Sequence, residues 1–239
     1  MGRFGIEGRM RLALAMLLVG ACAAPTQAGL FAKHAVGVTG IYGSPRPMTV
    51  TAPDGRTRAI ARFSDWTPDD DSDDHLSVFI GGDDHDFAGG PHAELLWAPD
   101  SRALAVTANA VTADDEDGQG SFETTILVRK PKGRHWREIN LTRKIRKLFA
   151  PQMLCDDHEK ANVGAVGWTS GQRLIVAAQV PVHSSCANRG GTAAYIVDVQ
   201  TGDVLMDVDA RVLRQRYGQM LGTAFPKIRA HHHRHRRKR

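Results

Sequence analysis

Short apolar runs separated by turn residues recur along the middle of this chain. Residues 48–51 and 57–63 flank Pro53-Asp54-Gly55, which has the composition of a hairpin turn. Further apolar runs cover residues 76–80, 103–106, 126–128, 174–178 and 195–197. Runs of this length between turn residues are typical of β-strands. The pattern therefore predicts a mostly β domain.

One longer pattern occurs twice. It consists of a Trp, a polar turn, two apolar strands and a second turn that contains Gly, and it begins at Trp97 and again at Trp168. The Gly of the second turn is Gly133 in the first copy and Gly202 in the other, 36 and 34 residues after the Trp. Repeats of this period are typical of stacked β units that cannot bury their own faces alone. We therefore expect two tandem sheet units.

Residues 48–80 match this unit only loosely. The hairpin at 48–63 corresponds best to the second half of the unit, because Val50 and Ile60 flank Gly55 at similar spacing. Trp66-Thr67-Pro68-Asp69 offers a first turn for a split third unit. The sequence therefore predicts two clear units and a split third.

The turn after the first Trp of the repeat contains Pro99 and Asp100, where the second copy has Ser170 and Gly171. With its alternating strands, this stretch resembles the repeats of TolB-type and related WD-like β-propellers. The resemblance implies that the Trp packs between blades and that the Pro-Asp turn links strands of one blade. Propellers close with four to eight blades. We therefore expect an incomplete, self-capped propeller-like stack of antiparallel sheets with short helices, or an oligomer that completes the ring.

Two segments have the periodicity of short amphipathic helices. Within 142–149, Ile145, Leu148 and Phe149 recur at helical spacing, opposite a basic face. Residues 210–217 have the same character and are followed by Gly218. We expect the first helix to cover the edge of a sheet.

The first 28 residues have the pattern of a signal peptide. Basic residues precede the apolar run at 12–19, which is too short to span a bilayer, and small residues follow. Cleavage is compatible with a site after Ala23 or after Ala28. Residues 19–22 also resemble a bacterial lipobox, in which Cys22 would carry the lipid. We expect a periplasmic or secreted protein with no span after signal removal, or alternatively a membrane-anchored lipoprotein.

The last nine residues, 231–239, contain four His and five Lys or Arg. Those five cations equal the formal net charge of +5, so the single domain expected at 29–230 is close to neutral. A block of like charge without apolar residues predicts a disordered tail, suited to anionic surfaces. The export signal and the lack of interleaved aromatic residues argue against a nucleic-acid partner.

Cys155 and Cys186 are the two cysteines beyond the signal segment. In an exported protein an even pair predicts a disulfide, here stabilising by roughly 3–4 kcal/mol on a chain-entropy estimate. A second interpretation adds His158 and His183, because Cys-x2-His and His-x2-Cys together could bind zinc. Oxidation of the thiols would destroy that zinc site.

Nine Asp lie between residues 65 and 86, and three His lie in or near the same segment. Carboxylates and imidazoles bind divalent metals, so one hypothesis is a metal site in loop-like sequence. Its candidate ligands are His75, Asp83, His85 and His92. Otherwise the segment is a solvated acidic loop.

No motif of a hydrolase nucleophile, a zinc protease or a phosphate-binding loop occurs. We therefore expect a binding or scaffold protein without a cofactor, whose partner is an envelope protein, an anionic surface or a second copy of the chain. The alternatives are a metal-dependent hydrolase that uses the loop at residues 75–92, and an envelope lipoprotein.

Overall fold

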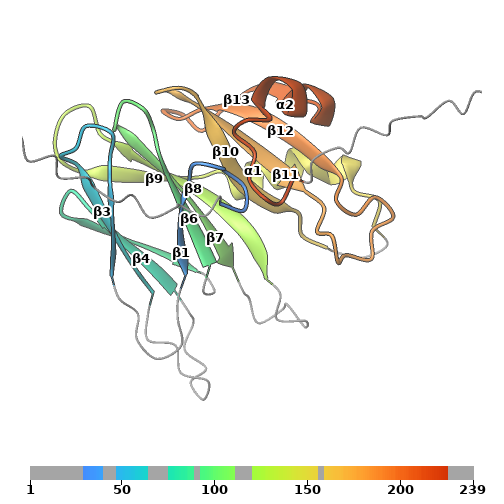
Figure 1. Ribbon diagram of the computed structural model, residues 1–239, viewed down its shortest axis with the longest axis horizontal. Coiled ribbons are helices and arrows are strands. Elements are labelled where there is room, and N and C mark those ends of the chain that lie inside the picture. The colour runs from blue at the N-terminus through green and yellow to red at the C-terminus, as the bar shows by residue number, and fades with distance from the viewer. Residues whose placement is uncertain are drawn as a thin grey trace, which may run out of the picture.

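Three antiparallel sheets form the part of the chain that the computed structural model describes, which is residues 29–39, 47–63, 75–88, 92–110, 120–155 and 159–225 (Figure 1). The first sheet contains β2 (Met48–Thr51), β3 (Arg58–Phe63), β4 (His75–Ile80) and β5 (Asp83–Ala88). The second contains β1 (Val36–Thr39), β6 (His92–Trp97), β7 (Ala103–Ala110), β8 (Ser121–Arg129) and β9 (Trp136–Asn140), in that order. The third contains β10 (Asn162–Ser170), β11 (Arg173–Gln179), β12 (Thr192–Asp198) and β13 (Val204–Val208). The predicted all-β fold with short helices is confirmed.

Apolar layers on both sides of the second sheet explain why its strands are apolar at consecutive positions. Leu104 and Val106 of β7 pack toward the first sheet, whereas Ala103 and Ala105 pack toward the third. A strand buried on both faces loses the apolar–polar alternation of a half-exposed strand. In β3, by contrast, buried and exposed residues alternate along the whole strand. The second sheet is therefore the centre of the stack.

The Trp residues of the repeat make the same contact in both copies. Trp97 Nε1–H donates to the carbonyl of Val50 in β2, at 3.3 Å. Trp168 Nε1–H donates to the carbonyl of Leu96 in β6, also at 3.3 Å. Each Trp therefore ties the first strand of its own meander to the first strand of the preceding one.

A bulge in β10 directs Trp168 toward the second sheet. Val163 and Ala165 face that sheet, but simple alternation would turn residue 168 to the opposite side. The pairing of β10 with β11 shifts register between Ala165 and Gly167. The extra residue of a bulge reverses the alternation beyond it, so the Trp joins the core.

The sequence predicted that the hairpin at 48–63 corresponds to the second half of the repeat unit. This prediction is wrong, because the hairpin forms the first two strands of its sheet, β2 and β3. Its turn at Ala52-Pro53-Asp54-Gly55 is equivalent to Ala98-Pro99-Asp100-Ser101, and Gly55 and Ser101 both have positive φ, at 69° and 61°. Thr51 stands where the other copies have Trp, which hid the match. Trp66 lies outside the described residues.

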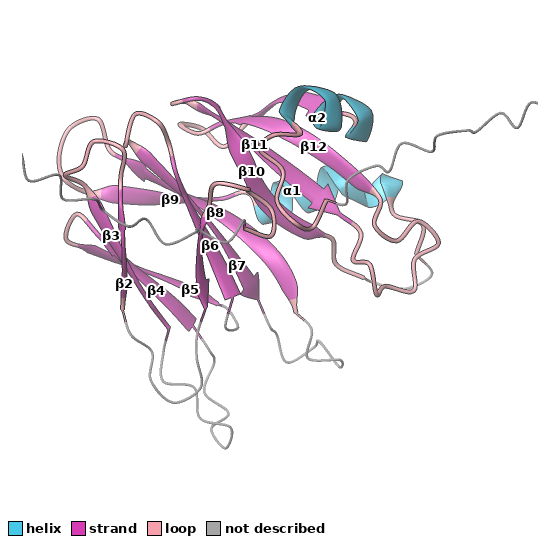
Figure 2. Ribbon diagram, in the orientation of Figure 1, coloured by secondary structure: helices cyan, strands magenta, loops and turns pink. Residues whose placement is uncertain are grey.

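Both helices lie on the side of the third sheet (Figure 2). In α1 (Thr142–Phe149), Ile145 and Phe149 are buried between the second and third sheets, but Leu148 is exposed. In α2 (Ala210–Tyr217), Leu213 is buried against the outer face of the third sheet. No helix in the described ranges is long and apolar enough to cross a membrane.

The two ends of the described chain complete the cover over the third sheet. Residues 29–33 pair with residues 220–224 through four backbone hydrogen bonds of 2.8–3.0 Å. The ring of Phe31 packs edge-on against Phe122 and Phe225, with centroids 5.2 and 6.1 Å away. A Cβ on Gly164 would collide with that ring, so only glycine leaves room for it. The third sheet is covered on its outer face.

Candidate functional site

A disulfide joins Cys155 to Cys186, as the sequence predicts, and their Cα atoms are 4.1 Å apart. It connects the segment after α1 to the loop between β11 and β12. Hydrogen bonds in the same place reinforce it, because Ala187 N–H donates to Leu154 O and Asn188 Nδ2–H donates to Gln152 O. The bond holds a connecting loop and is part of the scaffold.

The zinc hypothesis needs both thiols free. In this structure the two Sγ atoms are bonded to each other and cannot act as separate thiolate ligands. His183 is exposed, and His158 lies outside the described residues. A zinc site here stays a prediction for the reduced protein only.

The second candidate metal set is spread over three strands. His75 begins β4 and Asp83 begins β5, and the antiparallel register pairs His75 with Ala88 and Asp83 with Ile80, at opposite ends of the hairpin. Five residues of strand separate these ends by about 16 Å. His92 belongs to the next sheet. Among the described residues no three His, Cys, Asp or Glu side chains are grouped to hold a metal.

Two members of that set instead connect neighbouring sheets. Asp83 Oδ1 lies 2.9 Å from His135 Nδ1, and its Oδ2 accepts the Trp136 N–H at 2.7 Å. Both hydrogen bonds lower the pKa of the Asp83 carboxyl, and the bond with His135 has the larger effect. His85 is buried and its Nδ1 lies 2.7 Å from Glu138 Oε1. Asp83 and His85, which the sequence analysis proposed as metal ligands in a loop, therefore connect the edge strands β5 and β9.

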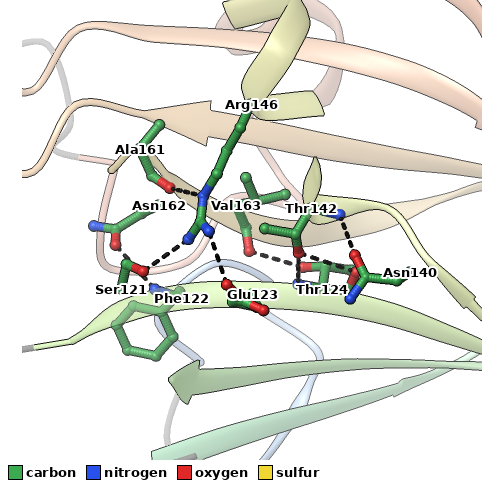
Figure 3. Close-up of polar contacts among 10 residues, drawn as sticks. All are labelled: Ser121, Phe122, Glu123, Thr124, Asn140, Thr142, Arg146, Ala161, Asn162 and Val163. Atoms are coloured by element: carbon green, nitrogen blue, oxygen red, sulfur yellow. Dashed lines mark hydrogen bonds and ion pairs between the residues drawn. The ribbon is translucent and has the colours of Figure 1, made fainter. Parts of the chain in front are cut away.

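An open hollow of about 440 Å³ lies where β8 and β9 meet α1, and it is lined by Glu123, Asn140, Thr142, Arg143 and Arg146. Figure 3 shows the hydrogen bonds of the Arg146 guanidinium to its neighbours. Its three nitrogens donate to Ala161 O at 2.9 Å, to Glu123 Oε1 at 2.7 Å and to Ser121 Oγ at 2.7 Å. Each of the three nitrogens thus has a protein partner, so the cluster joins α1 to two sheets.

Buried threonines continue this junction into the core (Figure 3). Thr124 Oγ1–H donates to Val163 O at 2.8 Å, and Thr142 Oγ1 accepts the Thr124 N–H at 2.8 Å. Thr107 Oγ1 accepts the Ala165 N–H at 3.0 Å. The sequence analysis missed these residues, because the sequence does not show which group on another strand a Thr hydroxyl will bond.

Among the residues that the structure describes, none covers the outer face of the first sheet. Ile60 and Phe79 are directly paired on β3 and β4, and 38% and 46% of their surfaces are exposed. Arg58 and Arg62 lie on β3 beside this pair, and Asp84 and Asp86 lie on β5 at the other side. We call these six residues the open face. The sequence contained a sign of this exposed apolar pair, since Ile60 and Phe79 occupy the outward positions of strands in which buried and exposed residues alternate.

Comparison with known proteins adds no relative: no protein-family model, curated protein or solved structure matches the chain. The resemblance to propeller repeats stays a prediction. Cys22 and the tail at 231–239 lie outside the described residues, so lipid anchoring and the disordered tail also stay predictions.

Proposed function

We propose that this protein is exported and acts in the cell envelope as a binding or scaffold protein, through the open face of its first sheet. The observation that carries the proposal is the asymmetry of the stack. α2 and both ends of the described chain cover the third sheet, whereas the open face has no cover within the described residues. The disulfide and the signal sequence support export.

The chemistry of the open face favours a protein partner. Ile60 and Phe79 form an apolar centre, and burying them would contribute about 25 cal/mol per Å² of apolar area removed from water. Both signs of charge flank that centre, on β3 and on β5. A purely anionic surface would be attracted by the two Arg but repelled by Asp84 and Asp86, whereas a protein surface can match both signs.

A pair of double variants tests this surface. Ile60→Thr with Phe79→Thr keeps good strand formers and removes the apolar centre. The control is Leu205→Thr with Met206→Thr on β13, where both side chains are exposed to a similar or greater extent. Each protein would be used to capture partners from its native envelope after mild cross-linking.

We expect the open-face variant to lose at least tenfold of a partner that the wild type and the β13 variant retain. Equal capture by all three proteins would contradict the proposal. Light scattering on the purified proteins identifies a second copy as the partner, if the wild type is a dimer and only the open-face variant is a monomer.

A further inference from the structure

The carboxylate of Glu94 is almost completely buried, with 6% of the residue exposed. It accepts hydrogen bonds from three consecutive backbone N–H groups, those of Leu30, Phe31 and Ala32. Phe31 N lies 3.1 Å from Oε2 and Ala32 N lies 3.3 Å from it. A side chain of the second sheet therefore holds the first residues of the described chain.

This carboxylate has no cationic partner among the described residues, because these three N–H groups are its only polar contacts there. Burial raises the pKa of the Glu94 carboxyl, and the N–H groups oppose that rise only in part. A buried charge without a counter-charge is costly. A cationic group on the adjoining backbone would offset that cost.

Gly29 lies directly against the same carboxylate. A Cβ on Gly29 would lie 2.7 Å from Glu94 Oε1 and 2.5 Å from Ala32 O, so any larger residue would collide with this group. The carbonyl of Gly29 is also fixed, because it accepts the Thr223 N–H at 3.0 Å. The backbone at position 29 is therefore held in place beside a buried acid.

We propose that a signal peptidase cuts the chain between Ala28 and Gly29, and that the new α-ammonium of Gly29 forms an ion pair with Glu94. Hydrolysis of this peptide bond consumes one water and leaves a carboxylate on Ala28 and an amine on Gly29. The amine takes up a proton at neutral pH, since the pKa of a free α-amino group is about 7.7–8.0. The cut thus supplies the missing cation.

The two other processing routes give a different molecule. Cleavage after Ala23, or lipidation at Cys22, leaves residue 28 attached, so that position 29 carries an uncharged amide. Only the cut after Ala28 gives Glu94 its counter-charge. The same segment pairs with residues 220–224, so the ion pair would secure both ends of the described chain over the third sheet.

The first test is the mass of the exported protein. The full chain, with its own leader, is expressed in a bacterium with a general secretion pathway, and the N-terminus of the exported product is sequenced by mass spectrometry. We expect the product to begin at Gly29. A product that begins at Ala24, or at an acylated Cys22, would overturn the proposal.

The second test measures the ion pair itself. Two forms are prepared by a protease that leaves no extra residue, one beginning at Gly29 and one beginning at Ala28, each also as Glu94→Gln. We expect the Gly29 form to melt about 5 °C above the Ala28 form. That difference should vanish in Glu94→Gln and persist in the control Asp84→Asn, an exposed carboxylate of the first sheet.

Equal melting temperatures of the two wild-type forms would contradict the ion pair. Should Glu94→Gln fail to fold, the reactivity of the α-amine decides the matter. In the folded Gly29 form an acylating reagent should modify the α-amine at least tenfold more slowly than in urea, whereas equal rates would overturn the proposal.

Discussion

At the scale of single residues, one indole hydrogen bond recurs between successive sheets. Trp97 donates to a carbonyl of β2 in the first sheet, and Trp168 donates to a carbonyl of β6 in the second. The two Trp differ in burial, because Trp168 is 9% exposed in the core and Trp97 lies partly in solvent. Trp97 also packs edge-on against Trp136, with ring centroids 5.9 Å apart. Trp168, the more buried of the two, should therefore contribute more to the free energy of unfolding.

Trp168→Phe removes the N–H that donates to Leu96 O and leaves a small cavity between the second and third sheets. We expect the free energy of unfolding to fall by about 2 kcal/mol. Trp97→Phe should lower the free energy of unfolding by about half as much, because water can replace the lost hydrogen bond at this partly exposed position. Urea denaturation of the two variants measures both values, and equal losses would show that burial does not set the difference.

At the scale of elements, the sequence predicted most strands from short apolar runs between turn residues, and both helices from helical spacing. It misassigned β5, because Asp83, Asp84 and Asp86 have the composition of an acidic loop. An edge strand tolerates such residues, since its outward side chains remain in solvent while His85 and Phe87 face the core. It also misaligned the first sheet, where Thr51 replaces the Trp that marks the other two.

The candidate sites depended on features that the sequence does not contain. The disulfide was the exception: the export signal and the count of two cysteines beyond it predicted the pairing, which the structure confirms. The proposed metal ligands failed to assemble because strand register, which alternation does not determine, separates His75 from Asp83. The Arg146 junction joins residues from distant parts of the chain. In the sequence, Arg146 is one of several basic residues on a short helix, and nothing distinguishes it from a solvent-exposed cation.

The junction at α1 allows a matched comparison of two neighbouring arginines. Arg146→Gln removes the ion pair with Glu123 and the bond to Ala161 O, whereas Arg143 is exposed at the rim of the same hollow. We expect Arg146→Gln to lower the free energy of unfolding by about 2 kcal/mol. Arg143→Gln should change it by less than about 0.5 kcal/mol. Chemical denaturation distinguishes the two, and similar losses would refute the junction.

At the scale of the whole molecule, the three sheets form a stack with unlike ends (Figure 1). The third sheet is covered by α2 and by the paired segments 29–33 and 220–224. The first sheet presents Ile60 and Phe79 on its outer side. A stack of β units buries each sheet against the next, so an uncovered terminal sheet is the place where a further layer can be added. We take that layer to be a partner protein.

Site-specific photo-cross-linking in the native cell tests this claim most directly. A photoreactive phenylalanine analogue is placed at position 79 on the open face, and at position 215 on the exposed side of α2 as the control. We predict that position 79 gives one defined protein adduct, and that this adduct disappears when Ile60 is changed to Thr, whereas position 215 gives none. Equal adducts at both positions, or no adduct at position 79, would contradict the account.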